Sequence, residues 1–308
     1  MTHQATIDQV NPQNYPGKDV YAVIGNPIAH SKSPIIHTFF AKQTNQAIHY
    51  GRIFSELNSF KETANQFFAD GGKGLNITVP FKLEAYELAQ KKTARAELAK
   101  AANVLWFKDG QLWCDNTDGV GLTRDLQRLL KKQNSSLKNA KVLILGAGGA
   151  AQGVIDPLMA ERVTQITIAH RTLEKAQQLV EQFKESAASA QVSLHAIDIQ
   201  QLGEIKCEAN EAFDLIINAT ATGLGDASPI SKEQLKTIAT AKTLAYDMVY
   251  GKDTRFMTDA NELGLKASDG LGMLVEQAAV AFEAWRDLND GQTQLDIDGA
   301  IAAVRATY

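Results

Sequence analysis

A glycine-rich turn in the middle of the chain has the residue types that bind a dinucleotide. In VLILGAGGAAQG, the small residues Gly146, Gly148 and Ala151 follow a buried apolar run and open a helical pattern in the order G-x-G-x-x-G/A. The first permits a tight turn, the second lets the backbone approach a pyrophosphate, and the third lets the helix pack on the strand. This context predicts a dinucleotide site rather than a merely structural turn. The predicted contacts are Gly146, Ala147, Gly148, Gly149 and Ala150.

The next predicted strand indicates which dinucleotide is bound. An NAD site usually has Asp or Glu at the end of that strand, whereas this chain reads AHRTLEK, with Arg171 and Lys175 and no acid at the strand end. A guanidinium suits the 2′-phosphate of NADP, so NADP (NADPH) is the predicted cofactor. The alternative is a solvated arginine. His170 and Thr172, on either side of Arg171, complete the predicted contacts.

Two charged side chains could handle a proton. GLNITVPFK ends a predicted strand at Val79, turns at Pro80 and delivers Lys82 to the first turn of a helix, while CDNTDG places Asp118 just before another helix. A lysine in that position is more often solvated than catalytic. A Lys and an Asp on loops that face a nicotinamide could nevertheless transfer the proton that accompanies hydride transfer.

A pair of serines raises a different question. GNPIAHSKSP places Ser31 and Ser33 after the run VYAVI and beside Pro34. Serine is a favoured N-cap and proline a favoured first helical residue, so the local sequence favours helix capping over ligand binding.

The elements that must position these residues alternate between strand and helix. Strands are predicted at 19–25, 47–54 and 72–79, with helices at 33–42 and 56–69 between them, and Asp109-Gly110 predicts a hairpin in VLWFKDGQLWC. A helix follows Gly119, and then come six apolar runs typical of strands buried on both faces: KVLILG, QITIAH, VSLHAI, DLIINA, TLAYD and GLKAS. The last segment is helical again.

The pattern predicts an α/β protein of two α/β domains. A mostly parallel, three-layer substrate domain is expected over 1–118 and 271–308, since the C-terminal helices return to it, and a Rossmann domain over 119–270. Residues 1–18 are interpreted as a mobile extension.

Composition excludes several classes of function. The chain of 308 residues is 44% hydrophobic and 21% charged, with a net charge of −4 and no block of Lys or Arg, so a nucleic acid partner is not expected. No apolar run has the roughly 18 to 20 residues that a membrane span requires. The sequence has two cysteines, Cys114 and Cys207, and scattered histidines. They form neither a disulfide framework nor a metal-ligand spacing, so we predict no metal site and a cytoplasmic location.

Seven motifs in order make the family recognisable. GNPIAHSKSP, NITVPFK, DNTDGVG, GAGGAA, INATATG, YDMVY and DGLGMLVEQAA closely resemble the shikimate dehydrogenase family, and the resemblance covers nearly everything after the N-terminal extension. It implies a two-domain monomer or homodimer that reduces 3-dehydroshikimate to shikimate with NADPH. Lys82 and Asp118 would then be the catalytic pair, and the serines Ser31 and Ser33 would bind the substrate carboxylate.

The resemblance implies further contacts. The substrate contacts would be Asn76, Thr78, Asn103, Asp118 and Gln277 for the ring hydroxyls, with Tyr250 near the carboxylate. Met248 and Gly270 would line the nicotinamide pocket, and Thr220 would lie along the cofactor. Asn103, Gln277 and Tyr250 each also have an ordinary structural interpretation, as a strand cap, a solvated helix position and a core aromatic.

Three positions depart from the family pattern. Val104 stands where threonine usually follows Asn103, His170 stands where asparagine usually precedes the cofactor arginine, and Gly251 begins a loop that commonly continues with Asn-Pro or Lys-Pro. Two rivals to the predicted function stay open. One is an NAD-dependent quinate/shikimate dehydrogenase, and the other is a dinucleotide-binding sensor without catalysis.

Overall fold

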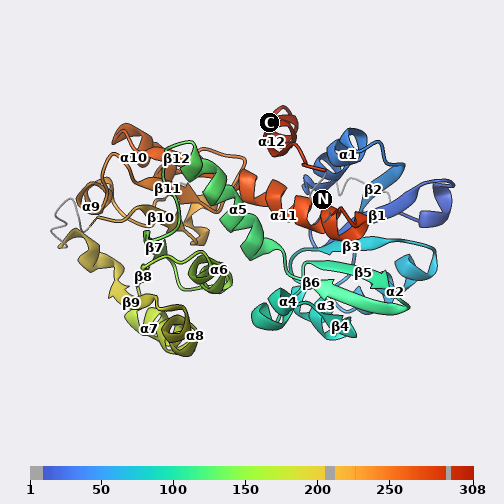
Figure 1. The fold of residues 1–308 in the computed structure, drawn as a ribbon, viewed down its shortest axis with the longest axis horizontal. Helices are drawn as coiled ribbons and strands as arrows, with labels where there is room; N and C mark the ends of the chain where they lie inside the picture. Colours follow the sequence, from blue (N-terminus) through green and yellow to red (C-terminus); the bar gives the residue numbers. More distant parts are fainter. Residues whose placement is uncertain (1–9, 205–211, 226, 289–292) are drawn as a thin grey trace, which may run out of the picture. The chain divides into compact units, whose positions relative to one another are not determined.

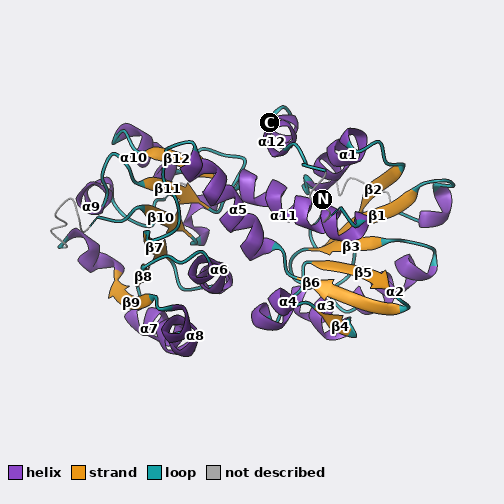
Figure 2. Ribbon diagram, viewed as in Figure 1, coloured by secondary structure: helices purple, strands orange, loops and turns teal. Residues whose placement is uncertain are grey.

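Two compact α/β units make up the structure, a computed structural model that describes residues 10–204, 212–225, 227–288 and 293–308. The first unit is Met1–Asp118 with Val275–Tyr308, and the second is Gly119–Leu274 (Figure 1). The chain therefore leaves the first unit at the start of one helix and returns to it within another. Both units alternate strands and helices along the sequence (Figure 2).

The first unit contains the strands and helices before Asp118 and the end of the chain. Its strands are β1 (Asp19–Gly25), β2 (Ile48–Phe54), β3 (Gly74–Ile77), β4 (Lys91–Lys92), β5 (Val104–Lys108) and β6 (Gln111–Asp115). Its helices are the 3-10 turn η1 (Pro12–Asn14), α1 (Ser33–Gln43), α2 (Phe60–Ala69), α3 (Lys82–Leu88), α4 (Ala94–Ala99), α12 (Ile297–Arg305) and the C-terminal part of α11 (Leu271–Arg286).

One six-stranded sheet of order β2-β1-β3-β5-β6-β4 forms the centre of this unit. Three of its pairings are parallel, and β5 is antiparallel to both of its neighbours, β3 and β6. The predicted hairpin is confirmed, because Asp109 and Gly110 between β5 and β6 have φ of 52° and 72°.

Alternate residues of β1 enter two different cores. Ala22 and Ile24 lie in an apolar cluster with residues of α2, α3 and α4, while Tyr21 and Val23 lie in a cluster with Tyr50 that Trp285 of α11 covers. Since successive side chains of a strand point to opposite faces, both faces of the sheet are buried. The prediction of a mostly parallel, three-layer unit is confirmed.

The second unit carries the longer parallel series. Its strands are β7 (Lys141–Leu145), β8 (Gln165–His170), β9 (Ser193–Asp198), β10 (Leu215–Asn218), β11 (Leu244–Asp247) and β12 (Lys266–Asp269). Its helical segments are α5 (Asp118–Lys131), α6 (Gly149–Ala160), α7 (Leu173–Gln182), α8 (Lys184–Ala190), η2 (Ile199–Gly203), η3 (Ala221–Leu224), α9 (Lys232–Ile238) and α10 (Arg255–Glu262), followed by the start of α11.

This second sheet is parallel throughout, in the order β12-β11-β10-β7-β8-β9. The order reverses between β7 and β10, and in doubly wound folds ligands bind at the carboxyl ends of the strands at such a switch point. Val142 and Ile144 of β7 face one core, and Leu143 and Leu145 face the other. The predicted Rossmann unit is confirmed.

Two local expectations are corrected. Strand β3 ends at Ile77 rather than at Val79, and helix α2 begins at Phe60 rather than at residue 56. After Ile77 the chain still runs beside the end of β1, since the Thr78 N–H donates to Ile24 O and the Asn26 N–H donates to Val79 O.

The predicted mobile extension is also partly wrong. Residues 1–9 lie outside the described residues, but residues 10–18 pack against the first unit. Val10 contacts the apolar core, Pro12 is buried, and the Tyr15 ring stacks on His49 with 3.6 Å between ring centroids. The segment is mostly polar, so its composition did not predict that these few residues pack against the unit.

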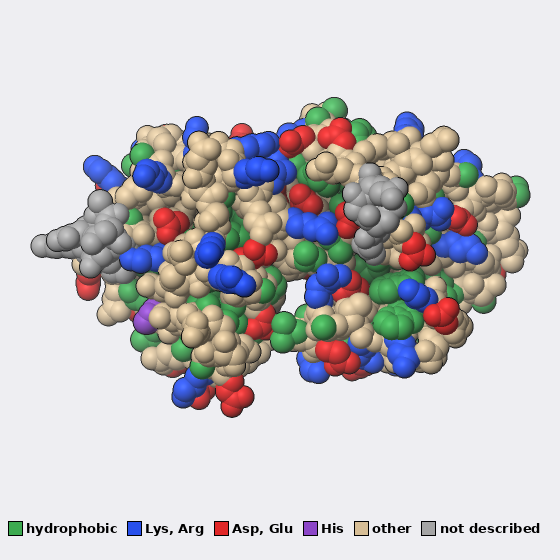
Figure 3. Space-filling view, viewed as in Figure 1, with side chains coloured by type: hydrophobic (Ala, Val, Ile, Leu, Met, Phe, Trp, Pro, Cys, Tyr) green, Lys and Arg blue, Asp and Glu red, His purple; other side chains and the backbone are tan. Residues whose placement is uncertain are grey.

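The surface is mixed in charge. On the face drawn in Figure 3, basic and acidic side chains are interspersed. Across the described residues, each helix is too short or too polar to cross a membrane.

Candidate active site

Lys82 and Asp118 form an ion pair within the first unit. Lys82 is the first residue of α3 and Asp118 the first of α5, and Lys82 Nζ donates to Asp118 Oδ2 at 2.6 Å. The two side chains are 33% and 29% exposed, so a ligand can still reach both. The structure thus brings together two residues that are 36 positions apart in the sequence.

A buried amide, Asn103, holds the other oxygen of Asp118. Asn103 Nδ2 donates to Asp118 Oδ1 at 2.9 Å and lies 3.2 Å from Gln277 Oε1. Asn103 Oδ1 accepts from the Thr117 N–H at 2.8 Å, and the Thr117 hydroxyl donates to the Gln277 carbonyl oxygen at 3.0 Å. Since Asn103, Thr117 and Gln277 are all buried, Asp118 has a fixed orientation.

Thr117 is a residue that the sequence did not single out. It is fully buried and joins Asn103 to α11. Its place between Asn116 and Asp118 in CDNTDG was the available signal, but threonine before a helix has the ordinary interpretation of a cap.

Asn76 and Thr78 lie at the end of β3. Asn76 is 5% exposed, its Nδ2 donates to the Asn103 carbonyl oxygen at 3.3 Å, and its Oδ1 accepts from the Tyr50 hydroxyl at 2.6 Å. Thr78 is half-buried beside Gly25, at the end of β1. The backbone of Asn103 therefore links the Asn76 side chain to the group that holds Asp118.

The two serines interact with each other more than with the helix. Lys32, not a serine, is the N-cap of α1, and it makes no side-chain capping bond. Ser31 Oγ lies 3.3 Å from Ser33 Oγ and accepts a long bond of 3.4 Å from the Ser33 N–H. Arg52 Nη2 donates to the Ser31 carbonyl oxygen at 2.6 Å and holds this loop. The geometry gives capping little support.

The glycine turn has the shape that a pyrophosphate needs. Gly146 has φ of +115°, and an added Cβ there would meet Thr220 at 3.1 Å, so both its conformation and its surroundings require glycine. An added Cβ at Gly148 or Gly149 would meet nothing within 4 Å. Ala151 is fully buried in the core beside β7. The exposed start of α6 thus offers open space and backbone N–H groups to an anion, and the residues fit the cofactor.

The end of β8 leaves its basic side chains exposed. His170 Nδ1 accepts from the Thr172 N–H at 3.0 Å and thereby shapes the turn around Arg171. Arg171 and Lys175 are exposed, and Thr172 between them is at the start of α7. A negatively charged ligand group could reach this turn.

Buried polar residues shape the loops after β10 and β11. Asn218 Nδ2 donates to Asp247 Oδ2 at 3.0 Å, and the Thr220 hydroxyl donates to Asn218 Oδ1 at 2.6 Å. Asp247 Oδ2 also accepts from the Thr254 hydroxyl at 2.7 Å. The sequence did not single out Asn218, Asp247 or Thr254, although INATATG and YDMVY contain the first two.

The remaining predicted residues follow these strands. Met248 is half-buried, and Gly270 packs so closely on the Met248 backbone that a Cβ would collide with its carbonyl oxygen. Tyr250 lies in the second unit and is 36% exposed, which does not fit the core-aromatic interpretation.

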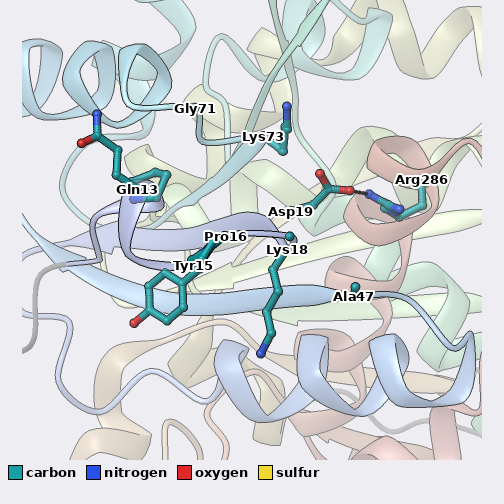
Figure 4. Close-up of a pocket in the computed structure, with 11 residues that line it drawn as sticks. Gln13, Tyr15, Pro16, Lys18, Asp19, Ala47, Gly71, Lys73 and Arg286 are labelled. Carbon is teal, nitrogen blue, oxygen red and sulfur yellow. Dashed lines mark hydrogen bonds and ion pairs between the residues drawn. The ribbon is translucent and has the colours of Figure 1, made fainter.

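A cavity of about 480 Å³ in the first unit contains none of the predicted residues. It is lined by the segment before β1 together with Lys73 and Arg286 (Figure 4). In the figure the Lys18 and Lys73 side chains point in opposite directions, and Arg286 is paired with Asp19 at 2.5 Å. Because its cations diverge or are paired, we do not assign this cavity to the reaction. Among the described residues, no three His, Cys, Asp or Glu side chains are grouped as metal ligands.

Three family models match the chain. They are the shikimate dehydrogenase substrate binding domain at residues 23–105, shikimate / quinate 5-dehydrogenase at 128–249 and the shikimate 5′-dehydrogenase C-terminal domain at 270–288. Together they span both units, in the order in which the motifs occur.

Relatives and solved structures agree with these matches. The shikimate dehydrogenase (NADP(+)) of Cupriavidus taiwanensis is 47% identical over 87% of this chain and 88% of its own length. An Ael1 enzyme from Pseudomonas putida is 39% identical, with a TM-score of 0.78 and coverage of 92% of this chain and 97% of that one. Shikimate 5-dehydrogenase from Thermus thermophilus, in complex with NADP(H) and shikimate, is 28% identical, with a TM-score of 0.76 and coverage of 94% and 100%. The resemblance predicted from the motifs is confirmed, and the chain belongs to the shikimate dehydrogenase family.

Proposed function

We propose that this chain catalyses the reversible, NADP-dependent reduction of 3-dehydroshikimate to shikimate, a step of aromatic amino acid biosynthesis. Its family and its NADP(+)-dependent relatives support this activity. The observation that carries the proposal is the Lys82–Asp118 ion pair of 2.6 Å, partly exposed and supported from behind by buried amides.

The ion pair supplies the proton in this scheme. NADPH, when bound, supplies the hydride to the ketone carbon. The Lys82 ammonium donates a proton to the ketone oxygen as negative charge develops on it, so the carbonyl becomes a secondary alcohol. Asp118 holds the ammonium in place, and Asn103 keeps Asp118 Oδ2 directed to the lysine by binding Oδ1. In the oxidative direction the neutral lysine takes the proton back.

Substrate recognition falls to polar side chains of the first unit. A polyhydroxylated ring with a carboxylate needs several amide, hydroxyl and carboxylate partners. Asn76, Thr78, Asn103, Asp118 and Gln277 would bind the ring hydroxyls, and Ser31 and Ser33 the carboxylate; Tyr250 is predicted near the carboxylate. Orientation by these groups lowers the barrier by fixing the reacting atoms in place.

Cofactor binding falls to the second unit. Gly146 to Ala150 would hold the pyrophosphate through backbone N–H groups, and His170, Arg171, Thr172 and Lys175 the 2′-phosphate. Thr220, Met248 and Gly270 would lie along the nicotinamide half. The open space beside Gly148 and Gly149 supports this assignment.

Initial rates test the proposal. Shikimate and quinate are each offered with NADP and with NAD, and we expect the highest kcat/KM for shikimate with NADP. Faster oxidation of quinate with NAD would instead identify a quinate dehydrogenase. Tight NADP binding without turnover of either substrate would favour the non-catalytic sensor.

Location and assembly complete the proposal. A cytoplasmic location is supported by the two cysteines, of which Cys114 is buried and free, while Cys207 lies outside the described residues. A monomer or a homodimer is expected, and light scattering of the purified protein distinguishes the two.

A further inference from the structure

Tyr50 is a buried tyrosine whose hydroxyl faces the predicted substrate residues. It lies on β2 and is 6% exposed. Its hydroxyl donates to Asn76 Oδ1 at 2.6 Å, a short bond between two buried groups. No motif in the sequence pointed to it.

The chemistry of its neighbours fixes which way the Asn76 amide faces. Asn76 Nδ2 lies 3.3 Å from the Asn103 carbonyl oxygen, which can only accept a hydrogen bond. The nitrogen must therefore be on that side, and the oxygen on the side of the Tyr50 hydroxyl. A flipped amide would place two oxygens against each other at Asn103. One amide N–H then makes no hydrogen bond among the described residues and is the group offered to a ligand.

The Tyr50 ring is held by aromatic packing. His37 of α1 stacks on it with 4.2 Å between ring centroids and 4° between the planes, and Trp285 of α11 lies at 6.4 Å. Burial raises the pKa of Tyr50 well above its ordinary value, although the nearby Ser33 and Arg52 partly oppose that rise. The hydroxyl therefore stays protonated and remains a donor to Asn76.

The same hydroxyl lies between the two halves of the predicted substrate site. Ser33, one of the two predicted carboxylate serines, lies near Tyr50 on one side, and Asn76 accepts from the Tyr50 hydroxyl on the other. Asn76 in turn reaches the Asn103 backbone, and the Asn103 side chain binds Asp118. The proposed function gives Tyr50 no part in proton transfer or in direct contact with the substrate.

We propose that Tyr50 is a positioning residue, which holds the Asn76 amide in the orientation that binds a ring hydroxyl of the substrate. This role rests on the proposed function. It predicts that the Tyr50 hydroxyl affects substrate affinity, not proton transfer or cofactor binding.

Tyr50→Phe tests the proposal, because it keeps the ring and its stacking and removes only the hydroxyl. Tyr21→Phe is the matched control. Tyr21 is 3% exposed and stacks on Trp285 in the same cluster, and its hydroxyl accepts from Arg286 at 3.2 Å rather than donating to Asn76. We expect Tyr50→Phe to raise the KM for shikimate by about fivefold to tenfold, as loss of a buried hydrogen-bond donor would. The KM for NADP should stay the same, and Tyr21→Phe should leave both constants unchanged.

A double-mutant cycle with Asn76→Ala shows whether Tyr50 acts through Asn76. If it does, adding Tyr50→Phe to Asn76→Ala should raise the KM for shikimate no further. Multiplied effects, an unchanged KM in Tyr50→Phe, or an equal rise in Tyr21→Phe would each overturn the positioning role. Melting temperatures with and without shikimate are measured beside the kinetics, so that a loosened fold is distinguished from a lost contact. A wild-type enzyme that does not oxidise shikimate would overturn the proposed function itself, and the role of Tyr50 with it.

Discussion

The predicted substrate site and the predicted cofactor site use different parts of the polypeptide. The first unit relies on side chains: an ion pair, three buried amides and a buried threonine bind one another. In the second unit, the glycine turn presents backbone and open space, and its basic side chains are exposed. A site of linked side chains is sensitive to what is removed from it, whereas a backbone site is sensitive to what is added.

The difference follows from what each site has to recognise. A ring with several hydroxyls needs donors and acceptors at fixed positions, and buried amides keep their orientation only when every polar atom has a partner. A pyrophosphate is a diffuse anion, and a helix start with small residues already provides N–H groups and room. Substitutions in both units test this contrast, from the largest expected effect to the smallest.

Removing the predicted proton donor should have the largest effect. We expect Lys82→Ala to lower kcat about a hundredfold to ten-thousandfold, as loss of a positioned general acid does, with little change in the KM for shikimate. Lys91→Ala, at an exposed lysine of β4, is the control and should leave kcat unchanged.

Asp118→Asn should also lower kcat, and it should raise the KM for shikimate as well. Because the two residues act as one unit, the double variant should be little worse than the poorer single one. Strictly additive losses would assign them independent roles, and near-normal turnover of Lys82→Ala would remove the lysine from the mechanism.

In the second unit, the exposed guanidinium of Arg171 at the end of β8 is the side chain whose loss should have the largest effect. Arg171→Ala should weaken NADP binding about tenfold to a hundredfold, the effect of losing one charge-assisted contact, and leave NAD nearly untouched. Fluorescence titration with both cofactors measures it, with Lys236→Ala on α9 as the control. Equal weakening of both cofactors would contradict a 2′-phosphate role.

An added methyl group should harm the glycine turn without harming the fold. Gly148→Ala should raise the KM for NADP by roughly tenfold, since a group forced into a tight contact costs about 1 to 3 kcal/mol, but the melting temperature should hold because the new Cβ meets no protein atom. Gly153→Ala, farther along α6 and equally open, should leave the KM for NADP unchanged. Matching effects of the two variants would mean that Gly148 does not face the cofactor.

The serines distinguish ligand binding from capping. Ser31→Ala and Ser33→Ala should each raise the KM for shikimate about fivefold and change the melting temperature little. Ser231→Ala should do the reverse, because Ser231 Oγ caps α9 in a complete capping box, worth about 1 kcal/mol of folding stability. Loss of stability with a normal KM in the Ser31 and Ser33 variants would restore the capping interpretation.

The last prediction concerns His37, whose substitution should change folding stability rather than turnover. Burial lowers the pKa of His37 to about 3, and the nearby Asn76 offsets only part of this lowering. Neither ring nitrogen makes a hydrogen bond of regular geometry among the described residues. Its ring packs on Tyr50, Phe282 and Trp285, none of them charged at neutral pH.

This burial predicts a pH dependence of stability. Below about pH 6.5 His37 is protonated in the unfolded chain but stays neutral in the folded chain. The free energy of unfolding should therefore fall by up to about 1.4 kcal/mol per pH unit as the pH decreases toward 3. Above pH 6.5 His37 is neutral in both states, so the free energy of unfolding keeps its full value. Urea unfolding of His37→Phe from pH 7 to 4 should show a shallower slope, and exposed His195→Gln should keep the wild-type slope. Equal slopes in all three proteins would refute the assignment.

The strands, the hairpin and the glycine turn could be predicted because they depend on near neighbours. The run DVYAVIG predicted β1 to the residue, the six apolar runs predicted β7 to β12, and Asp109-Gly110 predicted its turn. The family followed from the order of seven motifs. Lys82 and Asp118 lie in those motifs, whereas Arg171 came from the end of a predicted strand. Their roles stay predictions until the variants are measured.

The supporting contacts could not be predicted in this way. Thr117 and Gln277 are 160 positions apart, and Tyr50 and Asn76 are 26 apart on strands that do not pair with each other. The packing of residues 10–18 and the missing serine cap of α1 were likewise invisible, because composition and local preference favoured the opposite.

By itself, then, the sequence determined the α/β architecture, the family and the residue types able to bind a dinucleotide and move a proton. Side-chain periodicity and turn chemistry act between residues a few positions apart, so they can be read along the chain. Only the tertiary structure decided which groups support them: that Asn103 fixes Asp118, that Thr117 ties Asn103 to α11, and that Tyr50 faces Asn76. Hydrogen bonds depend on distances of about 3 Å in space, and separation along the chain does not encode those distances.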